Sequence, residues 1–181
     1  MLALCAPVLA SCGAEQAAPR ELLDSQPPAR MEPLRYPAVG LRFSAPTNWT
    51  REDGELPRVV TLTSGDALVA IWAYRRRQPL PSDAGELRAA RRRLVAEVRR
   101  RDRDFVLEKS GSLRVDRARA VELVGRQRIA GRGFRTRSVH VFRGRAEYVF
   151  EALAPPGEFS LANRRVLDSL LRSLSASGRI R

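Results

Sequence analysis

The sequence has little cysteine and histidine, and each scarcity excludes a class of chemistry. Cys5 and Cys12 are the only cysteines, too few for a zinc site with four cysteine ligands or for a network of disulfides. His140 is the only histidine, so a His-Glu-x-x-His zinc motif is impossible. Walker loops, calcium-binding loops and the Gly-x-Ser-x-Gly nucleophile elbow are absent as well. We therefore expect neither a cofactor nor a metal.

Long apolar runs and lysine are also scarce. A transmembrane helix needs about 20 consecutive apolar residues, and the sequence offers no such run. The net charge is +13, from 33 basic and 20 acidic residues, yet Lys109 is the only lysine. So strong a preference for arginine is typical of a GC-rich genome. The distribution of the charge is therefore more informative than its total.

The first apolar stretch contains Leu9-Ala10-Ser11-Cys12, followed by Gly13 and Ala14. It resembles the lipobox at the end of a bacterial lipoprotein signal peptide. The resemblance implies cleavage after Ser11 and a lipid anchor on Cys12. Two or more acyl chains, at roughly 0.8 kcal/mol per buried methylene, hold a soluble domain on a bilayer. Because no basic residue precedes the apolar run, we expect the true translation start to lie upstream.

The predicted organisation is a signal peptide at residues 1–11, a lipidated tether at 12–37, one domain at 38–176 and a tail at 177–181. The tether contains five prolines and no sustained periodicity. As a flexible coil it would hold the domain roughly 25 to 30 Å from the lipid. A domain of roughly 140 residues buries enough surface to fold without disulfides.

Alternating apolar residues and turn signals predict several strands and two helices in the domain. Turns are expected at Gly111 and at 143–145, and 155–157 ends the last strand. Apolar residues at helical spacing predict helices at 83–101 and from Phe159 to Leu174. The expected strands are 39–49, 59–63, 67–75, 119–129, 134–142 and 147–153, with an extended segment at 104–108.

These elements predict an α+β fold, in which a central antiparallel sheet of five to seven strands is flanked by amphipathic helices. Four features together resemble the PsbP/Mog1-like fold over about residues 36–175. They are the 39–49 strand leading into Trp49, the arginine-rich helix at 83–101, the meander of consecutive strands at 119–153 and the terminal helix with residues 170–174. The resemblance implies a mostly non-enzymatic family that binds protein partners or assists larger assemblies. It supplies no catalytic residues.

Side chains that could carry chemistry are few, and each has a structural interpretation. His140 lies in a strand between two valines, where a packed or hydrogen-bonded imidazole is expected in preference to a catalytic one. Glu147 and Glu151 share a strand face, which leaves a glycosidase-like pair open although solvated carboxylates are favoured. Trp72 and Tyr74 share another face, as a core stripe in preference to a ligand platform.

Other short patterns also have a structural interpretation. Asn48-Trp49-Thr50 matches a glycosylation acceptor, but a turn at Asn48 and a buried Trp49 are favoured. The glycines between the later strands are better explained by turns than by phosphate binding.

Positive charge is concentrated in the meander. Residues 110–145 hold ten arginines against two acidic residues. Many of these arginines recur two residues apart, which places each pair on one side of a strand. One interpretation is that these arginines form a solvated rim, with their aliphatic stems covering apolar surface. The other is a surface for anionic lipid or an acidic envelope polymer, with Arg126, Arg128, Arg135 and Arg137 as candidate anion-binding residues.

The sequence therefore predicts a lipid-anchored, non-enzymatic binding or assembly domain on the extracytoplasmic face of the cell membrane. Its expected partners are the membrane and an unidentified protein or anionic envelope polymer. Nucleic acid fits the charge, but the lipobox places the domain outside the cytoplasm. The alternative is a cell-envelope enzyme with an unrecognised carboxylate or His140 site.

Overall fold

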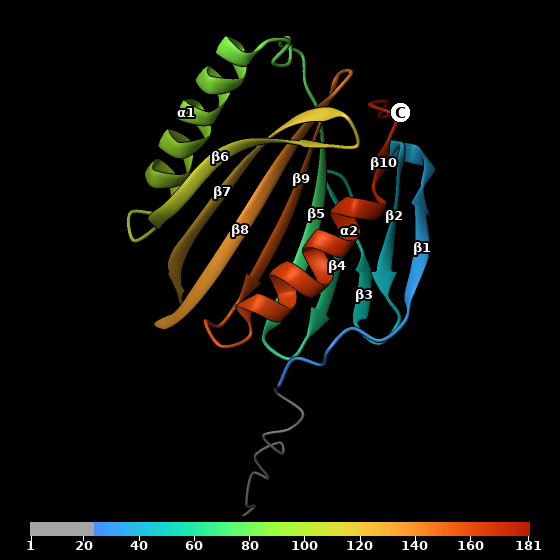
Figure 1. The fold of residues 1–181 in the computed structure, drawn as a ribbon, viewed down its shortest axis with the longest axis vertical. Coiled ribbons are helices and arrows are strands. Elements are labelled where there is room, and N and C mark those ends of the chain that lie inside the picture. Colours follow the sequence, from blue (N-terminus) through green and yellow to red (C-terminus); the bar gives the residue numbers. More distant parts are fainter. Residues whose placement is uncertain (1–23) are drawn as a thin grey trace, which may run out of the picture.

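The computed structural model describes residues 24–181, which form two antiparallel sheets and two main helical segments (Figure 1). The larger sheet has seven strands in the order β3-β4-β5-β9-β8-β7-β6, and the smaller has the order β1-β2-β10. The strands are β1 (Met31–Tyr36), β2 (Leu41–Pro46), β3 (Thr50–Asp53), β4 (Arg58–Ser64), β5 (Ala67–Arg75), β6 (Val106–Val115), β7 (Ala118–Ile129), β8 (Arg132–Arg143), β9 (Ala146–Ala154) and β10 (Ser175–Ala176).

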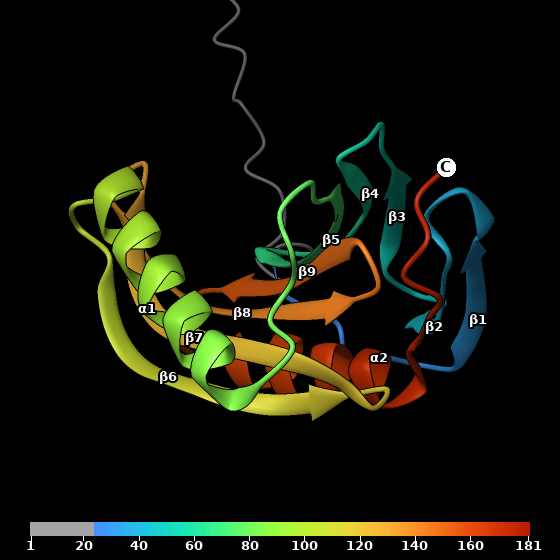
Figure 2. The ribbon, with the colours of Figure 1, turned by 90° about the horizontal axis from the view of Figure 1, so that it is seen from above.

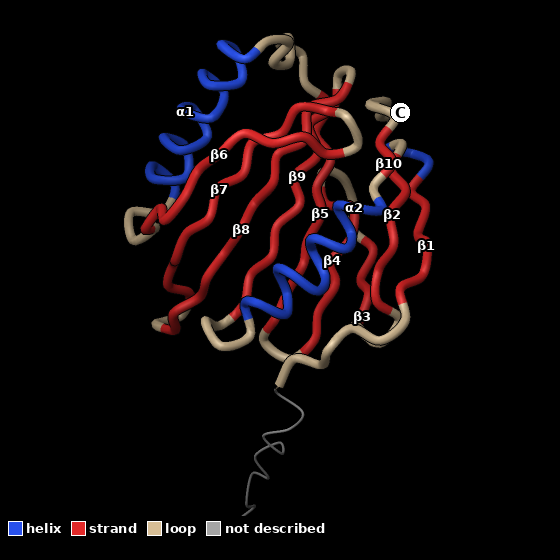
Figure 3. Tube along the Cα trace, in the orientation of Figure 1, coloured by secondary structure: helices blue, strands red, loops and turns tan. Residues whose placement is uncertain are grey.

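The helical elements, drawn in blue in Figure 3, lie between strands in the sequence. They are the short 3-10 turn η2 (Pro37–Val39), helix α1 (Ala84–Arg101), the π-helical segment η3 (Leu161–Leu167) and helix α2 (Asp168–Ser173), which continues η3. Strands β6 to β9 follow one another in the sheet, so the predicted meander is confirmed. The predicted α+β class is confirmed too. Within residues 24–181, no helix is long and apolar enough to cross a membrane.

Helix α1 begins where its sequence predicts. The carboxylate of Asp83 accepts a hydrogen bond from the Glu86 backbone N–H at 2.8 Å. In return, Glu86 accepts from the backbone and hydroxyl of Ser82 at 2.7 and 2.8 Å. These bonds satisfy N–H groups that have no partner within the helix. Three arginines in the last turn suit the negative end of the helix dipole.

The helices cover opposite faces of the large sheet (Figure 2). Segment η3 and helix α2 lie over β5, β9 and β2, where most of the core is found. Helix α1 lies over β6 and β7. Only Leu87 and Ala90 of α1 are buried, and they pack on Val121, Leu123 and Phe142. The C-terminal half of α1 is therefore less closely packed on the sheet than its N-terminal half.

Residues 31–36 differ from the expected tether, because they form strand β1 along β2. Leu34 is buried and the ring of Tyr36 stacks on Phe43 with centroids 5.7 Å apart. Pro33 is tolerated because β1 is an edge strand, whose outward N–H groups need no partner. Apolar contact and pairing therefore outweigh the coil signal of the prolines.

Three further element boundaries differ from those predicted. The expected 39–49 strand is divided into η2 and β2, and β3 follows separately. Gly111 is paired within β6, and the turn lies instead at Asp116 and Arg117, which both have positive φ. This two-residue turn type usually contains Asn-Gly or Asp-Gly, so the sequence gives little sign of it. The expected tail is also bound to the domain, since Ser177 N–H donates to Gly40 O at 2.9 Å.

Candidate functional site

A cavity of about 350 Å³ lies between the C-terminal half of α1 and the face of the sheet that this helix covers. Helix α1 contributes Leu94, Glu97, Val98 and Arg101 to its wall. The floor consists of alternate residues of neighbouring strands, because alternate side chains point to the same face. The floor residues include Trp72 and Tyr74 from β5, Thr136, Ser138 and His140 from β8, and Glu147, Val149 and Glu151 from β9.

Arg76, Glu147 and His140 form a connected polar cluster at one end of the cavity. Arg76 Nε donates to Glu147 Oε2 at 2.6 Å, and His140 Nδ1 lies 2.8 Å from Glu147 Oε1. Only 5% of the Glu147 side chain and 13% of the His140 side chain are exposed. Because an ionised carboxylate only accepts hydrogen bonds, the assigned tautomer carries the imidazole proton on Nδ1. Among residues 24–181, Nε2 has no hydrogen-bond partner.

The charge state of Glu147 follows from competing effects. Burial alone raises the pKa of a carboxyl group, but the hydrogen bond from His140 Nδ1 and the guanidinium of Arg76 outweigh it. The pKa of Glu147 is therefore lowered from its ordinary value. At neutral pH, Glu147 is an anion that orients its neighbours, not a proton donor. Burial also raises the pKa of Tyr74, whose ring lies beneath Arg76.

The cavity overturns two expectations and supports one. Trp72 and Tyr74 are half-buried and face the cavity, so the core-stripe interpretation was wrong. Glu147 is buried, so the expectation of a solvated carboxylate was wrong for this residue. The imidazole of His140 is hydrogen-bonded, as expected. The sequence could not reveal the cluster, because Arg76 precedes α1 while Glu147 and His140 lie on the later strands.

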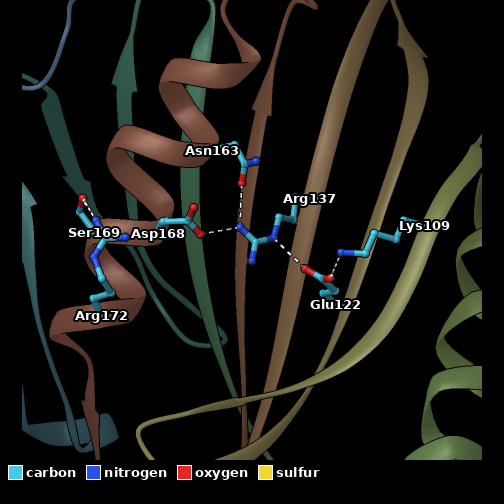
Figure 4. Close-up of polar contacts among 7 residues, drawn as sticks. All are labelled: Lys109, Glu122, Arg137, Asn163, Asp168, Ser169 and Arg172. Atoms are coloured by element: carbon cyan, nitrogen blue, oxygen red, sulfur yellow. Dashed lines mark hydrogen bonds and ion pairs between the residues drawn. The ribbon is translucent and has the colours of Figure 1, made fainter.

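Of the candidate anion-binding residues, Arg137 is committed to contacts within the domain (Figure 4). Its Nη1 donates to Asp168 Oδ1 at 2.6 Å and to Asn163 Oδ1 at 2.9 Å, and its Nε lies 3.1 Å from Glu122 Oε2. Lys109 Nζ reaches the other Glu122 oxygen at 2.6 Å. Burial raises the pKa of Glu122, but Lys109 and Arg137 outweigh it and the net pKa is lowered. The network links β6, β7 and β8 to η3 and α2.

The other three candidates are less enclosed. Arg126 and Arg135 flank the carboxylate of Glu108 at 2.9 and 2.8 Å. Arg135 also lies over the ring of Phe159, with Cζ 4.8 Å from the ring centroid. Arg128 is exposed and forms no ion pair within the described part of the chain. Anion binding by these arginines remains a prediction.

Cys12 and the lipobox lie outside the described residues. Trp49 is buried as expected, and its indole Nε1 donates to Gln26 O at 3.0 Å. The side-chain amide of Asn48 bonds Ala29 N–H and Pro27 O, so it fixes the segment leading to β1. Over residues 24–181, no three His, Cys, Asp or Glu side chains gather as a metal site.

Solved structures share this architecture. Cyanobacterial PsbP (CyanoP) from Synechocystis superposes with a TM-score of 0.61 at 14% identity, over 93% of this chain and 98% of that one. The fold is PsbP-like. LpqN of Mycobacterium tuberculosis, described as involved in cell envelope biogenesis, gives a TM-score of 0.57 at 12% identity, over 82% of this chain and 91% of that one. A Bacteroides thetaiotaomicron structure gives 0.55 at 11% identity, over 82% and 49%.

The PsbP-like fold confirms the resemblance inferred from the strand and helix pattern. No protein-family model matches the sequence, and no curated protein matches it either. At 11 to 14% identity, the structural likeness establishes the fold alone.

Proposed function

We propose that the chain is a lipid-anchored, non-enzymatic binding domain on the extracytoplasmic face of the membrane, with the cavity beneath α1 as its binding site. The Leu9-Ala10-Ser11-Cys12 sequence supports the anchor. The PsbP-like fold of a mycobacterial protein involved in cell envelope biogenesis supports an envelope role. The cavity is the observation that carries the binding function.

The cavity wall combines aromatic surface with fixed polar groups, as ligand sites generally do. Trp72 and Phe105 provide flat apolar surface, while Gln127, Ser138 and Glu151 provide donors and acceptors. Glu151 Oε1 accepts from Thr136 Oγ1 at 2.8 Å, which holds the carboxylate in place. Such a wall suits a ligand with both an apolar face and hydroxyl groups, and we assign it to a sugar unit of an envelope polymer.

The geometry favours binding over catalysis. Glu147 is held as an anion by Arg76 and His140, so it is not a general acid at neutral pH. Among residues 24–181, no serine, threonine or cysteine side chain is hydrogen-bonded to the imidazole, as an activated nucleophile would be. The cluster instead gives the cavity a rigid polar end.

Trp72 provides a direct test, since it lines the cavity and Trp49 is the only other tryptophan. In a Trp49→Phe background, oligosaccharides released from the envelope polymer should change Trp72 fluorescence saturably. Ser138→Phe, which places an aromatic ring inside the cavity, should abolish the change. Ser112→Phe is the matched control, because Ser112 is exposed on β6 outside the cavity. A response that persists in Ser138→Phe would place binding elsewhere.

One observation favours the enzymatic alternative. Glu147 and His140 form a carboxylate–imidazole pair with Nε2 unpartnered among the described residues, as in a base oriented by an acid. Mass spectrometry of the same oligosaccharides incubated with the protein distinguishes the two functions. Cleavage by the wild type that is lost in His140→Asn would establish an enzyme. Unchanged oligosaccharides supply no evidence for one.

A further inference from the structure

The first described residues contact the large sheet at the end where the β4–β5 turn and the β9–η3 loop lie. Ser25 donates its hydroxyl to Ser64 O at 2.7 Å and its N–H to the Glu158 carboxylate at 3.2 Å. Ser64 begins the β4–β5 turn and Glu158 lies in the β9–η3 loop. Figure 1 shows this entry point at the bottom of the view. We call it the entry end of the sheet.

The β7–β8 turn lies at the same end. Arg132, directly after this turn, forms an ion pair with Asp66 of the β4–β5 turn. In the sheet, Arg135 at the start of β8 pairs with Ala154 at the end of β9, which leads into the loop that holds Ser25. Three loops and the incoming chain are thus gathered at the entry end.

Exposed apolar side chains mark this end. Three large hydrophobic residues are strongly exposed in the described chain: Leu56, Val106 and Ile129. Ile129 is 42% exposed at the β7–β8 turn, and Val106 is 50% exposed at the start of β6, beside Arg126. Leu56, 51% exposed, lies in the β3–β4 loop at the opposite end of the sheet. Two of the three therefore lie at the entry end.

Arginines lie beside Val106, one of the two exposed apolar residues at this end. Arg103, Arg126 and Arg128 line a surface hollow with Val106 and Phe134, and Asp104 is the only acidic residue in its lining. Arg103 and Arg128 form no ion pair within residues 24–181, and Arg126 is 60% exposed despite its contact with Glu108. Guanidinium groups around exposed aliphatic side chains are typical of a surface that rests in a lipid headgroup layer.

We propose that the entry end docks on an anionic lipid bilayer, with Ile129 and Val106 at the acyl boundary and Arg103, Arg126 and Arg128 among the phosphates. The proposal rests on the lipid anchor of the proposed function. Ser25 follows Cys12 by thirteen positions, so the entry end lies at most about 45 Å from the lipidated residue. A lipid anchor and a basic patch together give stable attachment, where one weak signal does not.

The orientation is tested with the full chain carrying Cys5→Ala and Cys12→Ser, so that a new cysteine is unique and no acyl chain contributes. An environment-sensitive dye is attached at Ile129→Cys, or at Leu56→Cys as the matched control. With phosphatidylglycerol-containing vesicles, the dye at 129 should shift to the spectrum of an apolar environment and the dye at 56 should not. With pure phosphatidylcholine vesicles, both shifts should be small.

The arginines are tested in the same chain by vesicle sedimentation. Arg103→Gln with Arg128→Gln should weaken binding to the phosphatidylglycerol vesicles by about fivefold for each guanidinium removed. The control is Arg88→Gln with Arg92→Gln, two arginines that are exposed on α1 and should leave binding unchanged. Binding should also weaken as salt shortens the Debye length from about 10 Å at 0.1 M.

Four results would overturn the docking proposal. A dye response at 56 equal to that at 129, or an equal loss in the α1 variant, would place another face on the membrane. Binding to soluble anionic envelope polymer, without any spectral shift of the dye at 129, would mean that the entry end binds the polymer and not the bilayer. The absence of binding to anionic vesicles would exclude the surface altogether. None of these results depends on acylation, so lipid labelling of Cys12 tests the anchor separately.

Discussion

Arg137 Nη1 lies 2.6 Å from Asp168 Oδ1. This ion pair joins the middle of β8 to the first turn of α2. The same guanidinium contacts Glu122, of which only 12% of the side chain is exposed. An arginine so enclosed stabilises the fold and is not available to an external anion. Breaking a buried ion pair leaves an uncompensated charge.

Arg137→Met should therefore lower the free energy of unfolding by about 3 kcal/mol, measured by urea denaturation. Arg128→Met is the control, because this exposed side chain has no ion pair in the described chain and its loss should change stability by at most about 0.5 kcal/mol. Vesicle binding by folded Arg137→Met should match that of the wild type. Equal stability of the two variants would show that the network contributes nothing.

Glu147 should make stability depend on pH. Its pKa is lowered in the folded state, so its contribution is fully present above the unfolded-state pKa, about 4.3, and is lost as pH falls through the folded-state value. Glu147→Gln should cost about 3 kcal/mol at neutral pH. The difference between the wild type and the variant should narrow as the pH falls below about 4.

Glu97→Gln is the control for Glu147, because Glu97 lines the same cavity but is exposed and has no ion pair in residues 24–181. Its effect should stay within about 0.5 kcal/mol at every pH. A constant difference between the wild type and Glu147→Gln down to about pH 3 would show that ionisation of Glu147 does not stabilise the fold.

The apolar faces of α1 and α2 should contribute unequally to the free energy of unfolding. Leu170 of α2 is fully buried, so Leu170→Ala should cost about 2 to 5 kcal/mol. Leu94 of α1 is only half-buried, at the cavity wall. Leu94→Ala should cost only about 1 kcal/mol. Thermal unfolding of both variants checks the order, and a larger loss at Leu94 would mean that α1 packs more tightly than the structure shows.

The sequence predicted the fold well where periodicity is strong. Both strands of the β4–β5 hairpin and the extent of α1 follow from alternation, turn residues and the Asp83 cap. Strand β1 was missed because the five prolines of residues 12–37 favour coil. An edge position that tolerates Pro33 is a property of the assembled sheet. The shift of a turn from Gly111 to Asp116 and Arg117 has the same origin, since cross-strand pairing decided it.

The site was much less predictable. Arg76 and Glu147 are 71 residues apart in the sequence, and only strand order brings them together. The space beneath α1 depends on how few of its residues reach the sheet, which the apolar spacing of the helix does not reveal. The arginine pattern likewise gave four equivalent candidates, whereas burial separates Arg137 from Arg128.

Lipidation of Cys12 is the measurement that tests the proposed location and function most directly. The full chain is expressed in a bacterium grown with labelled palmitate, beside Cys12→Ser and a Cys5→Ser control. We expect label and detergent partitioning in the wild type and in Cys5→Ser, and neither in Cys12→Ser. A Cys12→Ser protein that is still processed and still partitions with detergent would contradict a lipid-anchored domain.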